Sequence, residues 1–359
     1  MLEKTIKSVI VKKINNWMES IDDENVKNVI KQNVVVTGGC FTSLMQNENP
    51  KDYDIYFKTK EAVPIVAEYY VKKFNENHVD LKNKLGIPIK AFVLTNDKLH
   101  IDNDILYIDN KDLADYLKGN EFRIGEQCDN INYTEFKGMS RMLCNLEKDR
   151  IKIFISSDGI AGQIEENNMH NMECGDDPVE IINELDNIKY NDVEKELVKE
   201  KYRPVFLSTN AITLSDGIQI VCRFYGEPET IHETYDFVHT KAYWTSYKNE
   251  IVIPKEVYEA VMNKHLIYTG SKYPLCSIVR MRKFIKRGWS INAGQILKMC
   301  MQLSDLDLKN IDVLEDQLCG VDSLYFTQLI NQFKDAKMKN NDWKYDTNYV
   351  ISVVDKIFG

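Results

Sequence analysis

The chain has 359 residues, of which 43% are hydrophobic and 28% are charged, and its formal net charge at pH 7 is −9. This composition is ordinary for a folded globular protein and excludes general disorder. The length allows a large core and predicts two or three domains. Because sequence-independent binding to nucleic acid depends on a basic surface, the acidic balance excludes broad electrostatic binding to DNA or RNA.

The apolar runs and the cysteines of the sequence predict the cellular compartment of the protein. No apolar run approaches the ~20 residues that a membrane-spanning helix needs, and lysines flank the N-terminal run Val9–Val11. We therefore expect neither a membrane partner nor a signal peptide. The eight cysteines form no C-x-x-C pair and have no histidine at zinc-finger spacing. They are typical of free thiols in a reducing cytoplasm, which is where we expect this protein.

The first 60 residues carry the most informative pattern. Amphipathic helical periodicity fills residues 1 to 32, and a β-branched strand follows at Val34–Thr37. The strand ends at Gly38 and Gly39, where a short helix can begin at once. A second strand then carries two aspartates separated by one residue.

These two aspartates, Asp52 and Asp54, lie two positions apart on a strand and therefore share a face. Two neighbouring carboxylates suit a hard divalent cation such as Mg2+. Gly38 and Gly39 lack a Cβ, so a phosphate could approach the backbone there, and the following helix N-terminus would favour that anion. The Gly-Gly pair alone is more typical of a plain turn, and the Asp-x-Asp pair alone of a solvated strand edge. The two motifs in this order favour a functional site.

Residues 61–202 follow as a predicted insertion. The pattern indicates a helix at Glu61–Phe74, strands at Ile87–Thr95 and Ile151–Ser156, and an acid-rich helix at Pro178–Lys199. Much of this region is polar and rich in Asn and Asp, and it shows no repeat of fixed period. We therefore interpret it as a large inserted α/β region.

The strongest β pattern comes next. Two runs, Asn210–Leu214 and Ile218–Phe224, flank a Ser-Asp-Gly turn and predict a hairpin. The aromatic run Tyr235–Trp244 predicts a further strand.

Asp236 is an acid inside that aromatic run, where an unpaired carboxylate would be costly to bury. Metal ligation would explain its presence, and the alternative is an exposed aspartate on the open side of a half-buried strand. Two rivals, Asp158 and Asp216, each precede a glycine in a Ser-Asp-Gly turn, and turn formation already explains them. His232 and His239 flank Asp236, but we interpret them as local loop and strand residues rather than catalytic groups.

A basic run predicts a helix between Pro274 and Gly288. On it Arg280, Lys283 and Arg287 follow helical spacing and form one basic stripe. The stripe is either a solvated helix face or a phosphate-binding surface. The candidate nucleotide-binding residues of this region are Lys272, Tyr273, Arg282, Lys283 and Arg287, with Tyr273 the candidate for base stacking.

The order of strand, Gly-Gly turn, short helix and Asp-x-Asp strand resembles the signature of the polymerase β-type nucleotidyltransferase superfamily. The residues that carry this resemblance are Gly38, Gly39, Ser43, Asp52 and Asp54. Residues 211–244, 268–294 and 314–326 also look like a group of phage-encoded nucleotidyltransferases of poorly defined role. The chain departs from tRNA CCA-adding enzymes in the residues after the two glycines, Cys40 and Phe41, so their tRNA specificity is not carried over.

The resemblance implies an enzyme that transfers NMP from an NTP such as ATP to an acceptor hydroxyl and releases pyrophosphate. It implies two Mg2+ ions, which Mn2+ could replace, held by Asp52, Asp54 and Asp236. It also implies that Gly38, Gly39 and Ser43 bind the β- and γ-phosphates. An RNA or tRNA 3′ end is one candidate acceptor. The alternatives are a protein or small-molecule acceptor, or a non-catalytic virion or binding protein on the same scaffold.

The predicted fold class is α/β (α+β), with a small mixed sheet and flanking helices. Residues 1–60 and 203–250 would form the nucleotidyltransferase core, residues 61–202 the insertion, and residues 251–359 a helical C-terminal domain. If the protein is phage-encoded, its cytoplasm is that of the bacterial host.

Overall fold

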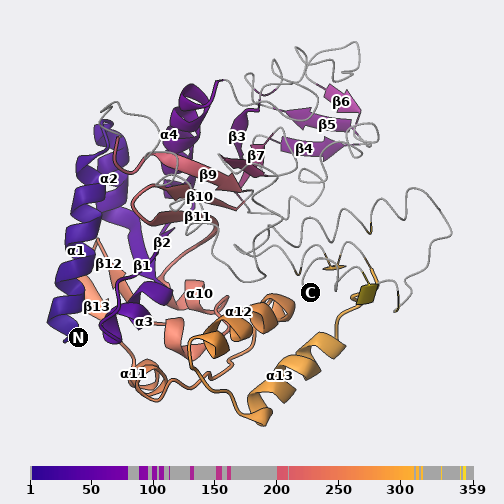
Figure 1. Cartoon of the computed structure of the whole chain (residues 1–359). Helices are drawn as coiled ribbons and strands as arrows, with labels where there is room; N and C mark the ends of the chain where they lie inside the picture. Colours follow the sequence, from indigo (N-terminus) through magenta and orange to yellow (C-terminus); the bar gives the residue numbers. More distant parts are fainter. Residues whose placement is uncertain are drawn as a thin grey trace, which may run out of the picture.

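The computed structural model describes a central body and several shorter segments (Figure 1). The described residues are 2–79, 89–95, 99–102, 105–108, 113, 130–132, 151–155, 160–162, 200–208, 210–310, 313, 314, 317, 333, 348, 351 and 352. The predicted helix Pro178–Lys199 and the turn at Asp158 lie outside the described residues.

A mixed sheet of eight strands forms the centre of the molecule. Its strands are β1 (Val34–Thr37), β2 (Tyr53–Phe57), β8 (Ile160–Gly162), β9 (Pro204–Ser208), β10 (Ala211–Leu214), β11 (Ile218–Tyr225), β12 (Tyr243–Thr245) and β13 (Glu250–Val252). Their order is β13-β12-β1-β2-β11-β10-β9-β8. Only the β2–β11 pair of this sheet is parallel, and the other neighbouring pairs are antiparallel. This arrangement confirms the predicted α+β class and the predicted β10–β11 hairpin.

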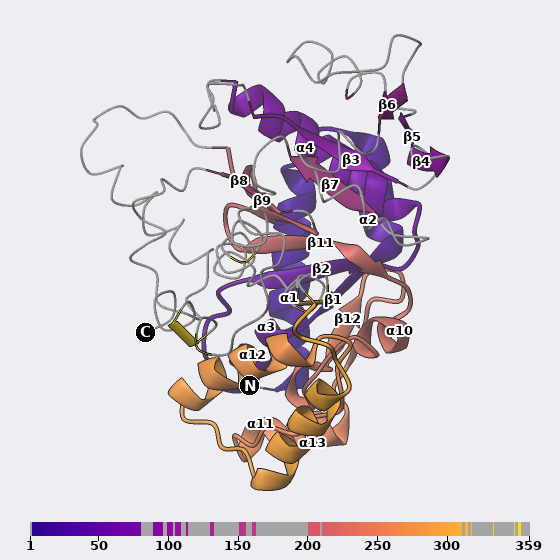
Figure 2. The same ribbon diagram turned by 90° about the vertical axis from the view of Figure 1, so that its right-hand side faces the viewer.

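Three helices, α1 (Glu3–Glu19), α2 (Glu24–Asn33) and α4 (Ala62–Asn77), pack against one face of this sheet (Figures 1 and 2). Apolar residues recur on α1 at helical spacing, so one stripe of the helix is buried. The buried residues of this stripe are Ile6, Ile10, Ile14 and Trp17. They share one core with residues of β1, β2, β10 and β11, which fixes the sheet against the helices.

Two smaller sheets come from the predicted insertion. β3 (Ala91–Leu94) pairs with β7 (Lys152–Ile155), within the two strands that the sequence predicts there. The other small sheet contains β4 (Leu99–Asp102), β5 (Ile105–Ile108) and β6 (Asn130–Asn132). The insertion also supplies β8, which extends the central sheet by pairing with β9.

The predicted strand Tyr235–Trp244 is wrong over most of its length, because only its last two residues, Tyr243 and Trp244, lie in a described strand, β12. After α10 (Pro228–His232) the chain forms an isolated bridge between Phe237 and Tyr268, and then the 3-10 helix η1 (Val238–Thr240). Around Asp236 the backbone bonds to the loop before α12, through Val238 N to Ile267 O and Thr269 N to Asp236 O, whereas Tyr243 and Trp244 at the end of the run pair with β1. These long-range contacts override the β propensity of the aromatic residues.

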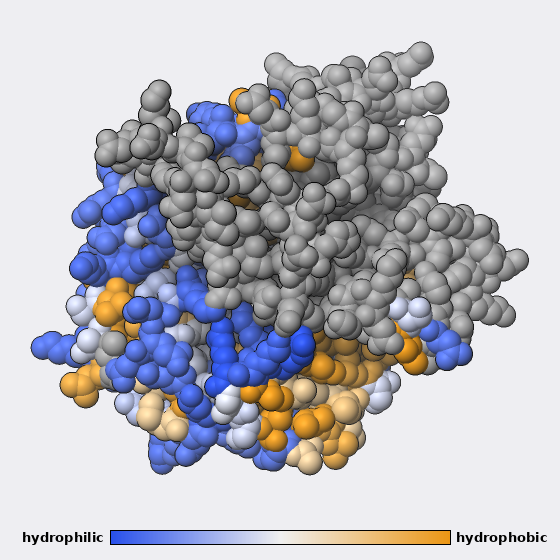
Figure 3. Space-filling model, in the orientation of Figure 1, coloured by the Kyte–Doolittle hydropathy of each residue, from blue (hydrophilic) through white to orange (hydrophobic). Residues whose placement is uncertain are grey.

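Three described helices follow the sheet: α11 (Lys255–Met262), α12 (Pro274–Lys286) and α13 (Ala293–Ser304). α12 confirms the predicted basic helix, with proline in its first turn. The exposed large apolar residues of α12 and α13 are Ile285, Ile296, Leu297 and Met301. Hydrophobic atoms gather in the lower part of Figure 3, where Figure 1 draws α12 and α13. Among the described residues, no helix has the length and apolar character needed to cross a membrane.

A buried hydrogen bond links α1 to α4 and generates a stability prediction. Trp17 Nε1 donates to the Tyr70 hydroxyl at 2.7 Å, and both side chains are buried. Tyr70→Phe should lower the free energy of unfolding by about 1–3 kcal/mol, because it leaves a buried indole N–H without a partner. Urea denaturation measures this loss. Tyr69→Phe, which removes a solvent-exposed bond to Asp22, is the matched control and should cost less; equal losses would contradict the prediction.

Candidate active site on the open face of the sheet

Side-chain alternation on the central strands leaves a polar face opposite the helices. On β2 the odd-numbered residues pack into the main core, so Asp54 and Tyr56 point to the other face. On β11 the even-numbered residues pack into that core, so Gln219, Val221 and Arg223 share the face of Asp54. We call this surface the open face.

Asp54 packs directly against a glycine at the end of β1. Gly38 has φ of +92°, a conformation that L side chains rarely adopt, and a Cβ built on it would clash with Oδ2 of Asp54. Thr37, the residue before Gly38, is the register partner of Asp54 across the β1–β2 pair. A glycine at position 38 is therefore required twice, for its backbone conformation and for the space that the carboxylate occupies.

Asp52 immediately precedes β2 and is half-buried, as Asp54 is. Burial first, and then the neighbouring Asp54 and Asp52 carboxylates, raise the pKa of the Cys40 thiol well above its ordinary value. Cys40 lies in the first turn of α3 (Gly39–Met45), so both acids lie near the start of this helix. The structure thus brings together the Gly-Gly turn, the short helix and the two acids that the sequence predicts as one site.

The Gly-Gly turn offers less backbone to a phosphate than the sequence suggests. Gly38 N already donates to Thr240 O at 3.2 Å. A Cβ at Gly39 would meet nothing within 4 Å, so the free space adjoins Gly39. Ser43 is half-buried on α3 and lies about one helical turn after Gly39.

Asp236 lies in a different environment from the other two acids. It is 5% exposed, and its Oδ2 accepts a hydrogen bond from Arg280 Nη1 of α12 at 2.8 Å. In the described part of the chain, no group of three or more His, Cys, Asp or Glu side chains is placed to hold a metal ion. The three predicted acids therefore do not form a ready-made metal cluster, and the role of Asp236 as third ligand stays a prediction.

The acids nevertheless share one electrostatic neighbourhood. Burial is the main cause that raises the pKa of Tyr56, on the open face of β2. Asp54 raises it further and Asp236 adds a smaller effect, whereas Arg280 lowers it. The Tyr56 hydroxyl thus lies within electrostatic reach of both carboxylates and of the guanidinium.

Arg223 is a site residue that the sequence analysis missed. It is 5% exposed on β11, donates to the Tyr273 hydroxyl, and holds its guanidinium carbon 4.6 Å from the centroid of that ring. Tyr273 precedes α12, so the pair connects this helix to the open face. An arginine within a mostly apolar strand was the available sequence signal.

The remaining predicted nucleotide-binding residues lie along α12 or just before it. Lys272, Arg282 and Arg287 are exposed and Lys283 is half-buried, whereas Tyr273 is buried. Of the five, Tyr273 is the residue whose contact with the open face is established, through Arg223. Arg280, which the sequence placed in the basic stripe, reaches Asp236.

The two histidines near Asp236 are packed locally, but His232 ends α10 instead of lying in a loop, and His239 lies in η1 instead of a strand. Thr37 Oγ1 donates to Ala242 O at 2.7 Å and lies 2.8 Å from His232 Nε2, which can donate to it. His239 is fully buried, between the rings of Phe284 and Trp289, and neither ring nitrogen has a hydrogen-bond partner. Burial lowers the pKa of both histidines to about 4.

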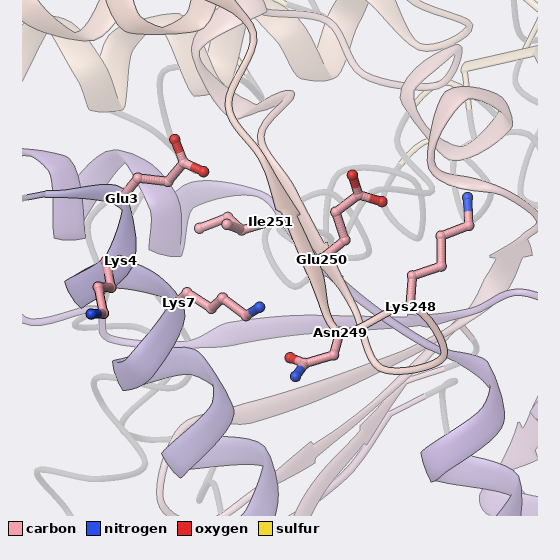
Figure 4. Close-up of a pocket in the computed structure, with 7 residues that line it drawn as sticks. All are labelled: Glu3, Lys4, Lys7, Lys248, Asn249, Glu250 and Ile251. Atoms are coloured by element: carbon pink, nitrogen blue, oxygen red, sulfur yellow. The ribbon is translucent and has the colours of Figure 1, made fainter.

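A hollow elsewhere on the surface carries none of these groups. It is lined by Glu3, Lys4, Lys7, Lys248, Asn249, Glu250 and Ile251 (Figure 4). These residues come from the start of α1 and from the β12–β13 hairpin, at the sheet edge that is three strands away from β2. The hollow therefore contributes nothing to the acid-bearing site.

Comparison with known proteins places the chain in a family. A family model described as "Gabija anti-defense 2 family protein", Gad2, matches residues 8–264, which is more than half of the chain. The chain belongs to the Gad2 family. No curated protein matches, and no solved structure matches.

This membership corrects the superfamily assignment made from the sequence. The match is to Gad2, and no nucleotidyltransferase family is shown, so the resemblance of the Gly-Gly and Asp-x-Asp pattern to polymerase β-type enzymes does not define the family of this chain. The motif is short and consists of a turn and two acids, and such features recur on unrelated folds.

The two neighbouring glycines allow a matched test of the Asp54 contact. Gly38→Ala should lower the free energy of unfolding by about 2 kcal/mol or more, because alanine is strained at positive φ and its Cβ displaces the carboxylate. Gly39→Ala, in open space in the first turn of α3, should be neutral or slightly stabilising. Chemical denaturation measures both variants, and similar losses for the two would refute the contact.

The buried His239 predicts a pH dependence of stability. Its pKa is about 4 in the folded chain and 6.5 as its ordinary value, so between these pH values the unfolded chain binds a proton that the folded chain does not. The free energy of unfolding should therefore fall as the pH is lowered through this window. His239→Leu, which keeps an apolar filling and removes both unpaired nitrogens, should flatten this dependence in urea titrations at pH 7, 6 and 5. An unchanged slope would contradict the assignment.

Proposed function

We propose that this Gad2 protein is a metal-dependent nucleotidyltransferase that acts at the open face. One observation carries the proposal: the Asp54 carboxylate packs on Gly38 at the mouth of the β1–α3 turn, with Asp52 beside it. A carboxylate pair next to a backbone turn with free space is suited to hold a cation-bound triphosphate. The proposal concerns the chemistry of this site and is independent of any superfamily assignment.

The donor set fits hard divalent cations. Asp52 and Asp54 are half-buried carboxylates and their neighbour Cys40 is held as a neutral thiol, so oxygen ligands predominate. Two Mg2+ ions, or Mn2+, would supply charge neutralisation and a lowered pKa of the acceptor hydroxyl when bound.

The protein groups then position the reactants. The acceptor oxygen forms a bond to the α-phosphorus of the NTP, the bond to the β-phosphate oxygen breaks, and pyrophosphate leaves while the hydroxyl proton passes to water. The open space at Gly39 would admit the β- and γ-phosphates, near the start of α3. Arg223 lies on the open face and Arg280 within electrostatic reach of Tyr56, so both would balance phosphate charge. Tyr273 would pack against the base.

The family description gives the biological setting. We infer that the protein is phage-encoded and counteracts the defense named in the family description inside the bacterial host. The acidic chain favours a protein or small-molecule acceptor of that response over a long nucleic acid, because net negative charge repels phosphate backbones. An RNA 3′ end remains the alternative acceptor.

A second candidate function is non-catalytic binding. The observation that favours it is the Asp236–Arg280 ion pair, which occupies one predicted ligand and one predicted phosphate-binding cation at the same time. A binding protein would keep such a pair as a structural link between α12 and the loop before η1.

Labelled nucleotides separate the two functions. The full-length protein is incubated with each α-labelled NTP and Mg2+, with tRNA, DNA or cell extract as acceptor, and the labelled product is identified. Nucleotidyl transfer predicts label in one acceptor class, together with release of pyrophosphate. No label in any acceptor, from folded protein, would favour the binding function.

The paired acids generate the corresponding mutational prediction. Asp52→Asn and Asp54→Asn should each abolish transfer, because they remove ligand charge, and should change stability by less than about 1 kcal/mol, because neither opens a core cavity. Asp216→Asn is the matched control and should retain activity, since Asp216 forms the β10–β11 turn at φ of +61°, where asparagine is tolerated. Wild-type turnover by either ligand variant would exclude the proposed site.

A further inference from the structure

A glutamine lies beside the acid pair at a position that the sequence analysis did not consider. In the parallel β2–β11 pair, Gln219 is the register partner of Asp54. Neighbouring strands lie ~4.8 Å apart and register partners point to the same face. The Gln219 and Asp54 side chains therefore leave the sheet next to each other.

The burial of Gln219 calls for an explanation. The residue is 5% exposed, and among the described residues its carboxamide makes no hydrogen bond, although its polar atoms are not fully enclosed. A largely covered amide loses hydration, so such groups usually meet a ligand, a water or an ion. The group beside it is the Asp54 carboxylate, which lies at the proposed cation site.

The composition of the site points to the role of this amide. Two carboxylates alone are a sparse ligand set, and no cluster of three acidic, histidine or cysteine side chains occurs among the described residues. Asp236 is held by Arg280. Carboxamide oxygens are ordinary ligands of hard divalent cations, and the Gln219 side chain is one methylene longer than that of Asp54, so it can extend to the same ion.

We propose that the carboxamide oxygen of Gln219 is the third protein ligand of the divalent-cation site formed by Asp52 and Asp54. This inference rests on the proposed function for the acid pair and adds to it the identity of the missing ligand. A neutral third ligand leaves the site with two negative charges, so the protein alone binds the cation weakly and the phosphates of the nucleotide complete the site.

The test measures Mn2+ binding by the full chain without nucleotide, from the electron paramagnetic resonance signal of the free ion. Gln219→Leu should weaken binding about tenfold or more, and Gln219→Glu, which adds a carboxylate at the same position, should strengthen it by a similar factor. Thr213→Val is the matched control, because Thr213 is the buried register partner of Gln219 on β10, one strand farther from Asp54. It should bind Mn2+ as the wild type does.

Two further variants make the outcomes distinguishable. If Asp54→Asn weakens binding but both Gln219 variants bind as the wild type does, the inference fails and the cation site of the proposed function survives. Weakening by Asp236→Asn but not by Gln219→Leu would overturn the inference in favour of Asp236. If Asp54→Asn binds Mn2+ normally, the acid pair is no cation site and both proposals fall. Circular dichroism establishes whether each variant folds. If Gln219→Leu does not fold, the Mn2+ affinity of Gln219→Glu tests the inference: stronger binding supports it and unchanged binding refutes it.

Discussion

The contact between the Asp54 carboxylate and Gly38 determines the geometry of the acid-bearing site. It brings the end of β1 against the start of β2, and it requires a residue that has no side chain and can adopt positive φ. The main core fixes the other side of both strands, since alternate residues of β2 pack beneath α1 and α4. Asp54 therefore cannot turn inward, and its charge must be met on the open face.

Two links through charged groups hold helix α12 near that face, in addition to the apolar packing of Ile278, Met281 and Phe284 against the core. Arg280 pairs with Asp236, and Arg223 donates to Tyr273. Buried charges are stable only with partners, so each link holds the helix in place and also uses a group that a phosphate or a cation could bind. Ligand binding at the open face would compete with these links, which couples the position of α12 to occupancy of the site.

The sequence predicted the local features of the site well, because short-range physics determines them. Two glycines after a β-branched strand and alternation on β2 suffice to place Asp52 and Asp54. Pairing between distant segments could not be predicted from the sequence in the same way. The aromatic run around Asp236 has strand propensity, but its backbone bonds to the loop before α12. The position of Gln219 beside Asp54 follows only from the β2–β11 register, which the sequence does not reveal.

The extent of the family match divides the site into two parts. Residues 8–264 include β1, β2, β11 and the loop that carries Asp236, so the acidic part of the open face lies within the Gad2 match. Tyr273 and Arg280 lie beyond it. The matched region thus contains the proposed acid pair and Gln219, whereas the proposed phosphate contacts of α12 come from residues outside it.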